Sequence, residues 1–179
     1  RQATRPAIVR STPEPAKPKL GKPQKTATAV KKTPTKSRPV PAIEPPALFS
    51  EKFRWPVEGR VVSPFGPKSN GLHNDGINIK ASRGTPVEAA ENGVVAYAGN
   101  ELRGFGNLLL IRHSDSWMSA YAHLEKVDVT RGTVIKRGQI VGKVGSSGSV
   151  GEPQLHFEIR KGSRAINPLK YLAKRGAGG

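Results

Sequence analysis

Short runs of alternating apolar and polar residues, separated by glycine-containing turns, fill the chain from residue 49 onward. In the run Gln154–Arg160, Leu155, Phe157 and Ile159 fall on one side, as expected for a strand that faces a core. No stretch keeps a 3.6-residue period over ten residues, and only residues 168–172 favour a helical turn. Similar β-branched runs occur at 59–62, 93–97, 107–112, 117–123 and 139–144. We therefore predict an all-β fold, an antiparallel β-sheet sandwich or half-barrel.

The same alternation predicts a polar groove on one side of the sheet. In Gln154–Arg160 the polar residues form a row opposite the core, and Asn78 lies between two isoleucines that face the core. Within 117–123, strict alternation puts the small residues on one face and Trp117, Ser119, Tyr121 and His123 on the other. If the polar faces of the three strands converge, they line a groove.

Composition divides the chain near residue 49. Residues 1–48 hold ten of the sixteen prolines and no aromatic residue, and their lysines lie between Lys17 and Lys36. Such a segment cannot bury enough apolar surface to offset chain entropy, so we predict a disordered, basic, proline-rich linker. A sharper hypothesis is that its lysines tether the domain to an anionic wall polymer or membrane. We predict a folded domain at 49–175 and a flexible tail at 176–179.

Charge and cysteine content limit the possible partners and the class of protein. The net charge of +17 favours anionic surroundings, but no nucleic-acid-binding motif accompanies it. The absence of cysteine rules out a disulfide framework, and no apolar run is long enough to span a membrane. The chain begins at Arg1 without a signal-peptide pattern, so we expect any targeting segment to lie upstream.

Seven short motifs, in order, give the chain a family resemblance. The run from Phe53 to Leu172 resembles a LytM-type, or lysostaphin-type, zinc peptidase domain, which implies that family's β fold. The stretches 97–107 and 155–160 are most similar to the degenerate branch of NlpD- and DipM-like cell division factors. The motifs are Gly-Ile-Asn-Ile at 76–79, Gly-Thr-Pro-Val at 84–87, Ala-Ala-Glu-Asn-Gly-Val-Val at 89–95, Gly-Phe-Gly-Asn at 104–107, Tyr-Ala-His-Leu at 121–124, Arg-Gly-Gln at 137–139 and Gln-Leu-His-Phe-Glu at 154–158.

The resemblance also implies which positions would carry a zinc site. Active members hold zinc with a histidine, an aspartate four residues later and the second histidine of a His-x-His pair, with two further histidines assisting catalysis. Alignment on the Gly-Ile-Asn-Ile motif puts Asn74 and Asn78 at two ligand positions, and Gln154 at the first position of the pair. His156 and His123 are retained. Amides are neutral donors and do not replace an imidazole and a carboxylate on zinc, so we expect no enzyme activity and no cofactor.

One alternative is that the chain is an active zinc peptidase with shifted ligands. His73 and Asp75 flank the position of the lost histidine, and a β-bulge could turn them into the groove. The zinc ligands would then be His73, Asp75 and His156, with His123 as the base. An unbroken strand period points both residues away from the groove instead.

The degenerate branch implies a regulator of peptidoglycan hydrolases, above all of N-acetylmuramyl-L-alanine amidases during cell division. Its partners would be such an amidase and peptidoglycan, in the periplasm or cell envelope of a Gram-negative bacterium. A passive wall-binding module is a further alternative, and residues 145–151 are expected to form a loop beside the groove. The expected contact surface comprises Asn74, Asn78, His123, Gln154 and His156, with Asn100 and Arg103 on an adjoining loop.

Overall fold

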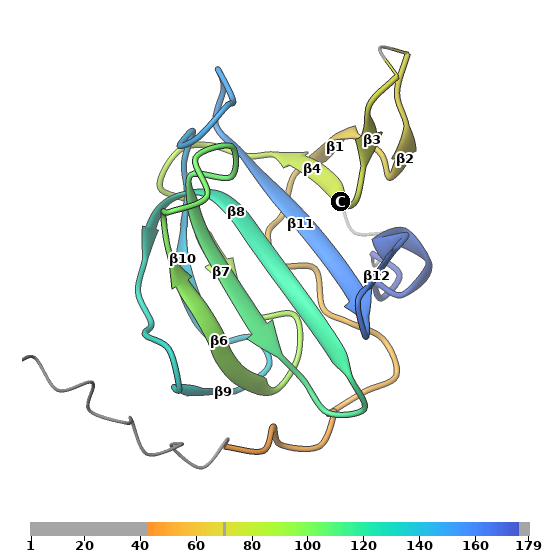
Figure 1. Cartoon of the computed structure of the whole chain (residues 1–179), viewed down its shortest axis with the longest axis vertical. Helices are drawn as coiled ribbons and strands as arrows, with labels where there is room; N and C mark the ends of the chain where they lie inside the picture. The colour runs from red at the N-terminus through yellow and green to blue at the C-terminus, as the bar shows by residue number, and fades with distance from the viewer. Residues whose placement is uncertain (1–42, 70, 176–179) are drawn as a thin grey trace, which may run out of the picture. The chain divides into compact units, whose positions relative to one another are not determined.

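The computed structural model describes residues 43–69 and 71–175, and within them the chain is built almost entirely of β-strands (Figure 1). This confirms the predicted all-β, antiparallel fold. The helical element of this part is a short 3₁₀ turn, η1 (Pro168–Lys170), and no helix in it is long and apolar enough to cross a membrane. The strands are β1 (Arg60–Ser63), β2 (Gly66–Pro67), β3 (His73–Asn74), β4 (Ile77–Lys80), β5 (Pro86–Glu88), β6 (Gly93–Gly99), β7 (Asn107–Arg112), β8 (Trp117–Val127), β9 (Val134–Ile135), β10 (Ile140–Val144), β11 (Gln154–Lys161) and β12 (Arg164–Ile166).

One large sheet carries most of the fold. Its strands follow the order β1-β4-β11-β8-β7-β6-β9, while β10 joins through β8 and β5, and β12 through β11. Figure 1 shows β6, β7, β8 and β11 side by side, with the small β2–β3 hairpin near β1 and β4. Burial alternates along β1 and β4, whereas β8 and β11 at the centre of the sheet are buried over most of their length.

The long strand β8 belongs to two parts of the sheet. Its first half pairs with β11 and β7, whereas Leu124 and the residues after it pair with β10. The register with β7 shifts between these halves, and His123 at the junction has a positive φ of 62°. A non-glycine residue with positive φ interrupts the strand period, so β8 bends there and the sheet folds over.

The core lies between the folded-over layers. Tyr121 and Phe157, on adjacent strands, pack with ring centroids 5.3 Å apart, and both are fully buried. The Tyr121 hydroxyl accepts a hydrogen bond from the backbone N–H of Ala90, and burial raises the pKa of this phenol to about 12. Leu155, Phe157 and Ile159 lie in the same core, as the alternation of that run predicts.

The segment before the first strand lies against the sheet. The carbonyl of Ile43 accepts a hydrogen bond from Arg112, and that of Ala47 accepts one from Asn92. These residues are the described end of the predicted linker. The rest of the predicted linker and the predicted tail, residues 1–42 and 176–179, lie outside the described part of the chain.

Candidate functional site

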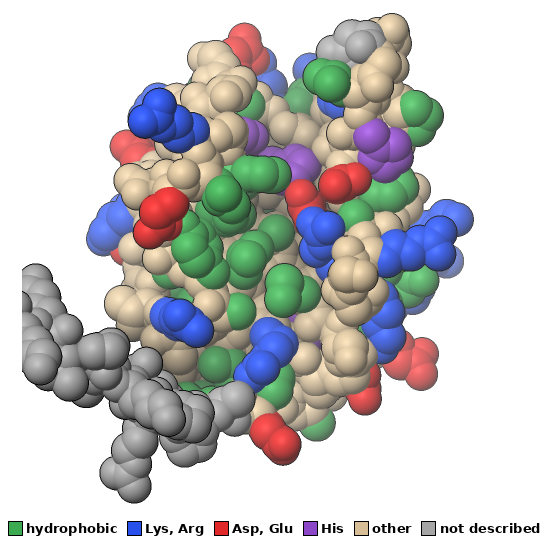
Figure 2. All heavy atoms as spheres, viewed as in Figure 1, with side chains coloured by type: hydrophobic (Ala, Val, Ile, Leu, Met, Phe, Trp, Pro, Cys, Tyr) green, Lys and Arg blue, Asp and Glu red, His purple; other side chains and the backbone are tan. Residues whose placement is uncertain are grey.

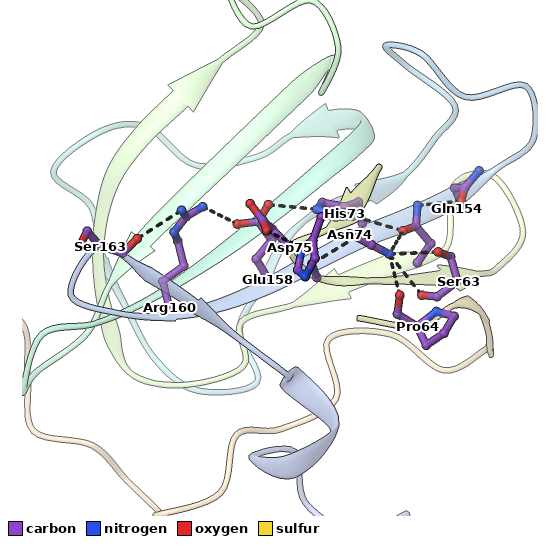
Figure 3. Close-up of polar contacts among 12 residues, drawn as sticks. Ser63, Pro64, His73, Asn74, Asp75, Gln154, Glu158, Arg160 and Ser163 are labelled. Atoms are coloured by element: carbon purple, nitrogen blue, oxygen red, sulfur yellow. Dashed lines mark hydrogen bonds and ion pairs between the residues drawn. The ribbon is translucent and has the colours of Figure 1, made fainter. Parts of the chain in front are cut away.

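Three side-chain amides form a continuous hydrogen-bonded row that crosses three strands (Figure 3). Asn74 on β3 donates from Nδ2 to Oδ1 of Asn78 on β4 at 3.1 Å, and Asn78 donates from Nδ2 to Oε1 of Gln154 on β11 at 2.9 Å. Asn74 also donates to Ser63 Oγ and accepts from the backbone N–H of Gly76. We call Asn74, Asn78 and Gln154 the amide ladder. The hydrogen bonds between its members connect β3, β4 and β11, and so join distant parts of the chain.

The row continues from the amide ladder through His156 to two charged residues. His156 contacts Oδ1 of Asn78 through Nδ1 at 3.2 Å and Oε1 of Glu158 through Nε2 at 3.0 Å. Both partners are acceptors, so the two bonds form together only when both ring nitrogens carry a proton. Arg160 donates from Nη1 to Oε2 of Glu158 at 2.7 Å.

The carboxyl of Glu158 is held ionised although it is almost fully buried. Burial acts to raise its pKa, but hydrogen bonds and opposite charge from His156 and Arg160 outweigh burial and lower the pKa below the ordinary value. Glu158 therefore bonds to both neighbours on β11, and its ion pair with Arg160 offsets its charge.

His123 enters the site through the bend in β8. Its Nδ1 lies 2.9 Å from the carbonyl of Ser147, to which it donates, and its backbone N–H donates to the carbonyl of Phe105. The ring centroid is 6.0 Å from that of His156, and burial lowers the pKa of the imidazole. The positive φ at this residue turns the ring out of the strict strand alternation.

This bend corrects the predicted face of β8. The prediction put Ser119 and Tyr121 on the groove side together with His123, but both are fully buried, and Tyr121 packs in the main core. Cross-strand pairing instead aligns Ala122 with His156 and Ala120 with Glu158. Directly paired residues share a face of the sheet, so the small residues, not the larger ones, lie beside the polar row.

Two loops in close contact form the rim of the groove beside His123 and His156. The rim loop, residues 100–106, lies so close to the glycine loop, residues 145–151, that a Cβ on Gly148 would be 2.6 Å from the carbonyl oxygen of Gly104. The hydroxyl of Ser147 accepts from the backbone N–H of Asn107 at 3.0 Å and donates to the carbonyl of Leu124. Only residues without side chains permit this approach.

The predicted contact residues separate into two groups. The structure brings together the amide ladder, His156 and His123, from β3, β4, β11 and β8. Asn100 and Arg103 are exposed on the rim loop, outside this network. They lie beside the site rather than in it.

His73 and Asp75, the ligands of the alternative zinc site, also lie outside the network. They contact each other at 3.0 Å, their side chains are about half exposed, and Phe65 packs edge-on against the imidazole of His73. Within residues 43–69 and 71–175, no group of three or more His, Cys, Asp or Glu side chains is placed to hold a metal ion.

Strand alternation missed an apolar area next to the polar row. Leu108, Ala120 and Ala122 form a buried cluster separate from the main core, with Tyr97 and Leu110 packed against it. Figure 2 shows hydrophobic side chains gathered over β6, β7 and β8 on this face. The alternation of residues 107–112 and 117–122 predicts this apolar area if the bend at His123 is taken into account. We call Tyr97, Leu108, Leu110, Met118, Ala120 and Ala122 the apolar strip.

A folded-over antiparallel sheet with this groove is the architecture of LytM-type domains, and the comparisons with known proteins agree. The description "Peptidase family M23" matches residues 72–168, more than half of the chain. The chain therefore belongs to peptidase family M23. A crystal structure of a putative M23 peptidase from Pseudomonas aeruginosa superposes with a TM-score of 0.65 at 28% identity, covering 72% of this chain and 54% of that one. Lysostaphin from Staphylococcus simulans gives 0.63 at 31% identity, over 73% and 58%.

Three relatives are more similar in sequence. The chain is 50% identical over 109 residues to "Cell division protein DipM" of Caulobacter vibrioides, covering 61% of this chain and 18% of the relative. It is 45% identical over 123 residues to "Murein hydrolase activator NlpD" of Escherichia coli, over 69% and 32%. It is 41% identical over 143 residues to "Uncharacterized lipoprotein YgeR" of Escherichia coli, over 80% and 56%. The chain thus spans less than two thirds of the length of each.

Proposed function

We propose that this domain is a catalytically inactive LytM-type factor that activates peptidoglycan hydrolases, specifically N-acetylmuramyl-L-alanine amidases, during cell division. The names of NlpD and DipM support a role in murein hydrolase activation and in division. The lipoprotein name of YgeR supports a location in the periplasm or cell envelope of a Gram-negative bacterium. Peptidoglycan is the second proposed partner, because its carboxylates suit a chain of net charge +17.

The hydrogen bond between Asn74 and Asn78 carries the proposal. The family resemblance puts both residues at zinc-ligand positions, yet each amide is committed to a protein partner. Zinc prefers neutral imidazoles and anionic carboxylates or thiolates, and two primary amides supply neither. His156 does not complete a set, because both of its nitrogens face acceptors. The residues at these positions therefore do not fit a zinc ion, and we propose that this domain acts without a cofactor.

Activation without catalysis requires a binding surface. In the proposed mechanism the groove takes up an inhibitory helix or loop of the amidase, and binding shifts the amidase toward its active state. The rim loop and the glycine loop frame the groove and hold His123 through Ser147. Nucleic acid is not a proposed partner.

A second candidate is a zinc endopeptidase that uses His73, Asp75 and His156, with His123 as base. The contact between His73 and Asp75 favours it, because a carboxylate beside an imidazole is common around zinc. Against it, both side chains are about half exposed on the β3 side of the ladder, where they bond to each other. A third candidate, a passive wall-binding module, rests on net charge alone.

One assay separates the three candidates. Dye-labelled peptidoglycan is incubated with the chain alone, with an amidase encoded by the same genome, and with both. The proposal expects release only with amidase and a several-fold increase on adding the chain. Release by the chain alone, abolished by chelation and restored by zinc, would establish the endopeptidase. Binding to the sacculi without any effect on release would establish the passive module.

A further inference from the structure

The segment before the first strand carries an aromatic ring that faces solvent while its backbone is held by the domain. Phe49 is 76% exposed, the largest exposed fraction of any large apolar side chain in the described part of the chain. Its backbone N–H donates at 2.7 Å to Oε1 of Glu91, a fully buried carboxylate. The carbonyl of Ala47, two residues earlier, accepts from Nδ2 of Asn92. The exposed ring is therefore attached to a backbone that is fixed in position.

Phe49 borders a hollow of about 570 Å³ beside β9. Val134 on β9, which is 51% exposed, lines the same hollow. The guanidinium carbon of Arg137 lies 5.7 Å from the centroid of the Phe49 ring, so a cation stands directly beside the aromatic surface. We call this site the β9 hollow, and its apolar and cationic lining residues are Pro46, Phe49, Val134, Arg54, Lys136 and Arg137.

The charge accessible in the β9 hollow is positive. Among the described residues, none that line it is acidic. Arg137 pairs with the buried Glu91, and Arg54 pairs through Nε with Glu88. Lys136 is exposed beside these two guanidiniums and adds a further cation. The hollow therefore suits a ligand that combines negative charge with apolar surface.

The basic part of the chain joins the domain at this edge. Residues 1–42 hold eleven Lys or Arg against one Glu, and they are followed by Ile43, six residues before Phe49. Like charge opposes filling a cationic hollow with these residues. A second copy of a chain with a net charge of +17 is disfavoured for the same reason. The ligand that fits best is therefore an anionic partner.

An anionic phospholipid surface has both required properties. Aromatic and aliphatic side chains enter the boundary between head groups and acyl chains, while Lys and Arg keep their charges at the phosphates. Peptidoglycan also carries carboxylates, but its sugars and short peptides offer little apolar surface to Phe49 and Val134. Figure 1 shows β9 at the lower edge of the domain, and β6, β7 and β8 separate it from β11 in the sheet. The β9 hollow is thus distinct from the amide ladder.

We infer that the β9 hollow is a membrane-contact site for anionic phospholipid, with Phe49 and Val134 in the interface and Lys136 at a phosphate. Residues 1–42 add attraction through their charge. Stable membrane attachment requires two weak signals, and an apolar contact together with a polybasic segment is one such pair. This contact is independent of amidase activation, which is measured without membranes.

Vesicle binding by the full chain tests the assignment. Co-sedimentation compares vesicles of phosphatidylcholine alone with vesicles that also contain phosphatidylglycerol, and the Tm of each variant checks its folding. On the anionic vesicles Phe49→Glu should weaken binding by roughly ten-fold and Lys136→Glu by about five-fold or more. Lys143→Glu, exposed on β10, is the control of equal charge change and should weaken binding by less than about two-fold. Wild-type binding by both hollow variants overturns the site.

A fluorophore at position 49 identifies the surface that the ring meets. The chain has no cysteine, so Phe49→Cys and the control Val62→Cys, exposed on β1 at the other end of the sheet, each take one environment-sensitive label. A blue shift at position 49 alone, with anionic vesicles but not with phosphatidylcholine, supports the assignment. Equal shifts with both kinds of vesicle overturn it. A shift with purified peptidoglycan but no vesicles, or on raising the chain concentration alone, assigns the hollow to the wall or to a second copy and also overturns it.

Discussion

The side chain of Asn74 donates a hydrogen bond to that of Asn78, four residues further along the chain, at 3.1 Å. Through this bond β3 is joined to β4, and through Gln154 the connection reaches β11. A metal ion at the same positions would link the same strands. The amide ladder therefore holds the strands on this side of the groove together with hydrogen bonds.

Removing the central amide should destabilise the domain. Asn78→Ala leaves the Nδ2 of Asn74 and the Oε1 of Gln154 without one partner each, and His156 loses its contact with Asn78. An intramolecular hydrogen bond contributes about 0.5–1.5 kcal/mol, so losing the bonds to Asn74 and Gln154 should lower the free energy of unfolding by about 1–3 kcal/mol. Denaturant unfolding measures it.

The matched control for that experiment is Asn78→Asp. A carboxylate of the same shape accepts from Asn74 and from His156, and the amide of Gln154 can turn to donate to it. We expect a loss of less than about 1 kcal/mol. Equal losses for both variants would mean that keeping the side-chain shape and its acceptor oxygen is not enough, and that the Nδ2–H donor of Asn78 stabilises this region.

Introducing two zinc-binding side chains should create a metal site. The double variant Asn74→His with Asn78→Asp supplies an imidazole and a carboxylate beside His156, which is the donor set zinc prefers. Calorimetry after chelation should show one zinc bound per chain, at least roughly a hundred-fold more tightly than to the wild type. Adding His156→Ala should remove most of this gain. Zinc binding by the wild type that is lost on His73→Ala would instead support the alternative ligand set.

The sequence predicts the fold and β11 well, but not the course of β8. In β11 an unbroken period of two places Leu155, Phe157 and Ile159 in the core and His156 on the polar row. In β8 the same rule fails, because His123 adopts a positive φ that no residue type in the run announces. Because strict alternation does not predict this bend, it also does not predict the apolar strip. The sequence predicts the positions of the three amide-ladder residues. It does not predict the hydrogen bonds among them, because these depend on how closely β3, β4 and β11 approach one another.

The contact between the two loops should be sensitive to a single methyl group. Gly106 has a positive φ of 63°, and a Cβ there would lie 2.4 Å from Ser147 Oγ and 2.5 Å from the backbone nitrogen of Gly148. Gly106→Ala should push the glycine loop away and lower the free energy of unfolding by about 1–3 kcal/mol. It should also reduce amidase stimulation, because Ser147 holds His123.

Gly151→Ala is the control for this loop variant. Gly151 lies in the same glycine loop, has no positive φ, and has open space where its Cβ would be built. We expect its Tm and stimulation to match the wild type. If Gly106→Ala behaves like Gly151→Ala in both measurements, the loop contact does not constrain the groove.

Stability should fall as the solution is acidified below neutral pH. Burial lowers the pKa of His113, outweighing the opposing contributions of the Asn92 carbonyl and of Glu91, and burial also lowers the pKa of His123. The unfolded chain then takes up protons first, so the stabilisation is complete above the ordinary value of 6.5 and is lost as pH falls toward the folded pKa. Each group contributes at most about 1.4 kcal/mol per pH unit.

The Tm measured between about pH 7.5 and 5 should therefore decline, and His113→Gln should flatten the slope. This range lies above the ordinary carboxyl pKa of 4.5, so the lowered pKa of Glu158 does not contribute. An unchanged slope in His113→Gln would assign the pH dependence to other groups.

The amide ladder has a consequence for growth when metals are scarce. A zinc peptidase of this fold loses activity when the envelope is depleted of zinc, because its groove is completed by the ion. A groove held by the hydrogen bonds among Asn74, Asn78 and Gln154 should keep its shape under chelation. In a bacterium starved of zinc, the proposed activator would remain competent, and the supply of metal would limit wall remodelling only through the hydrolase that it is proposed to stimulate.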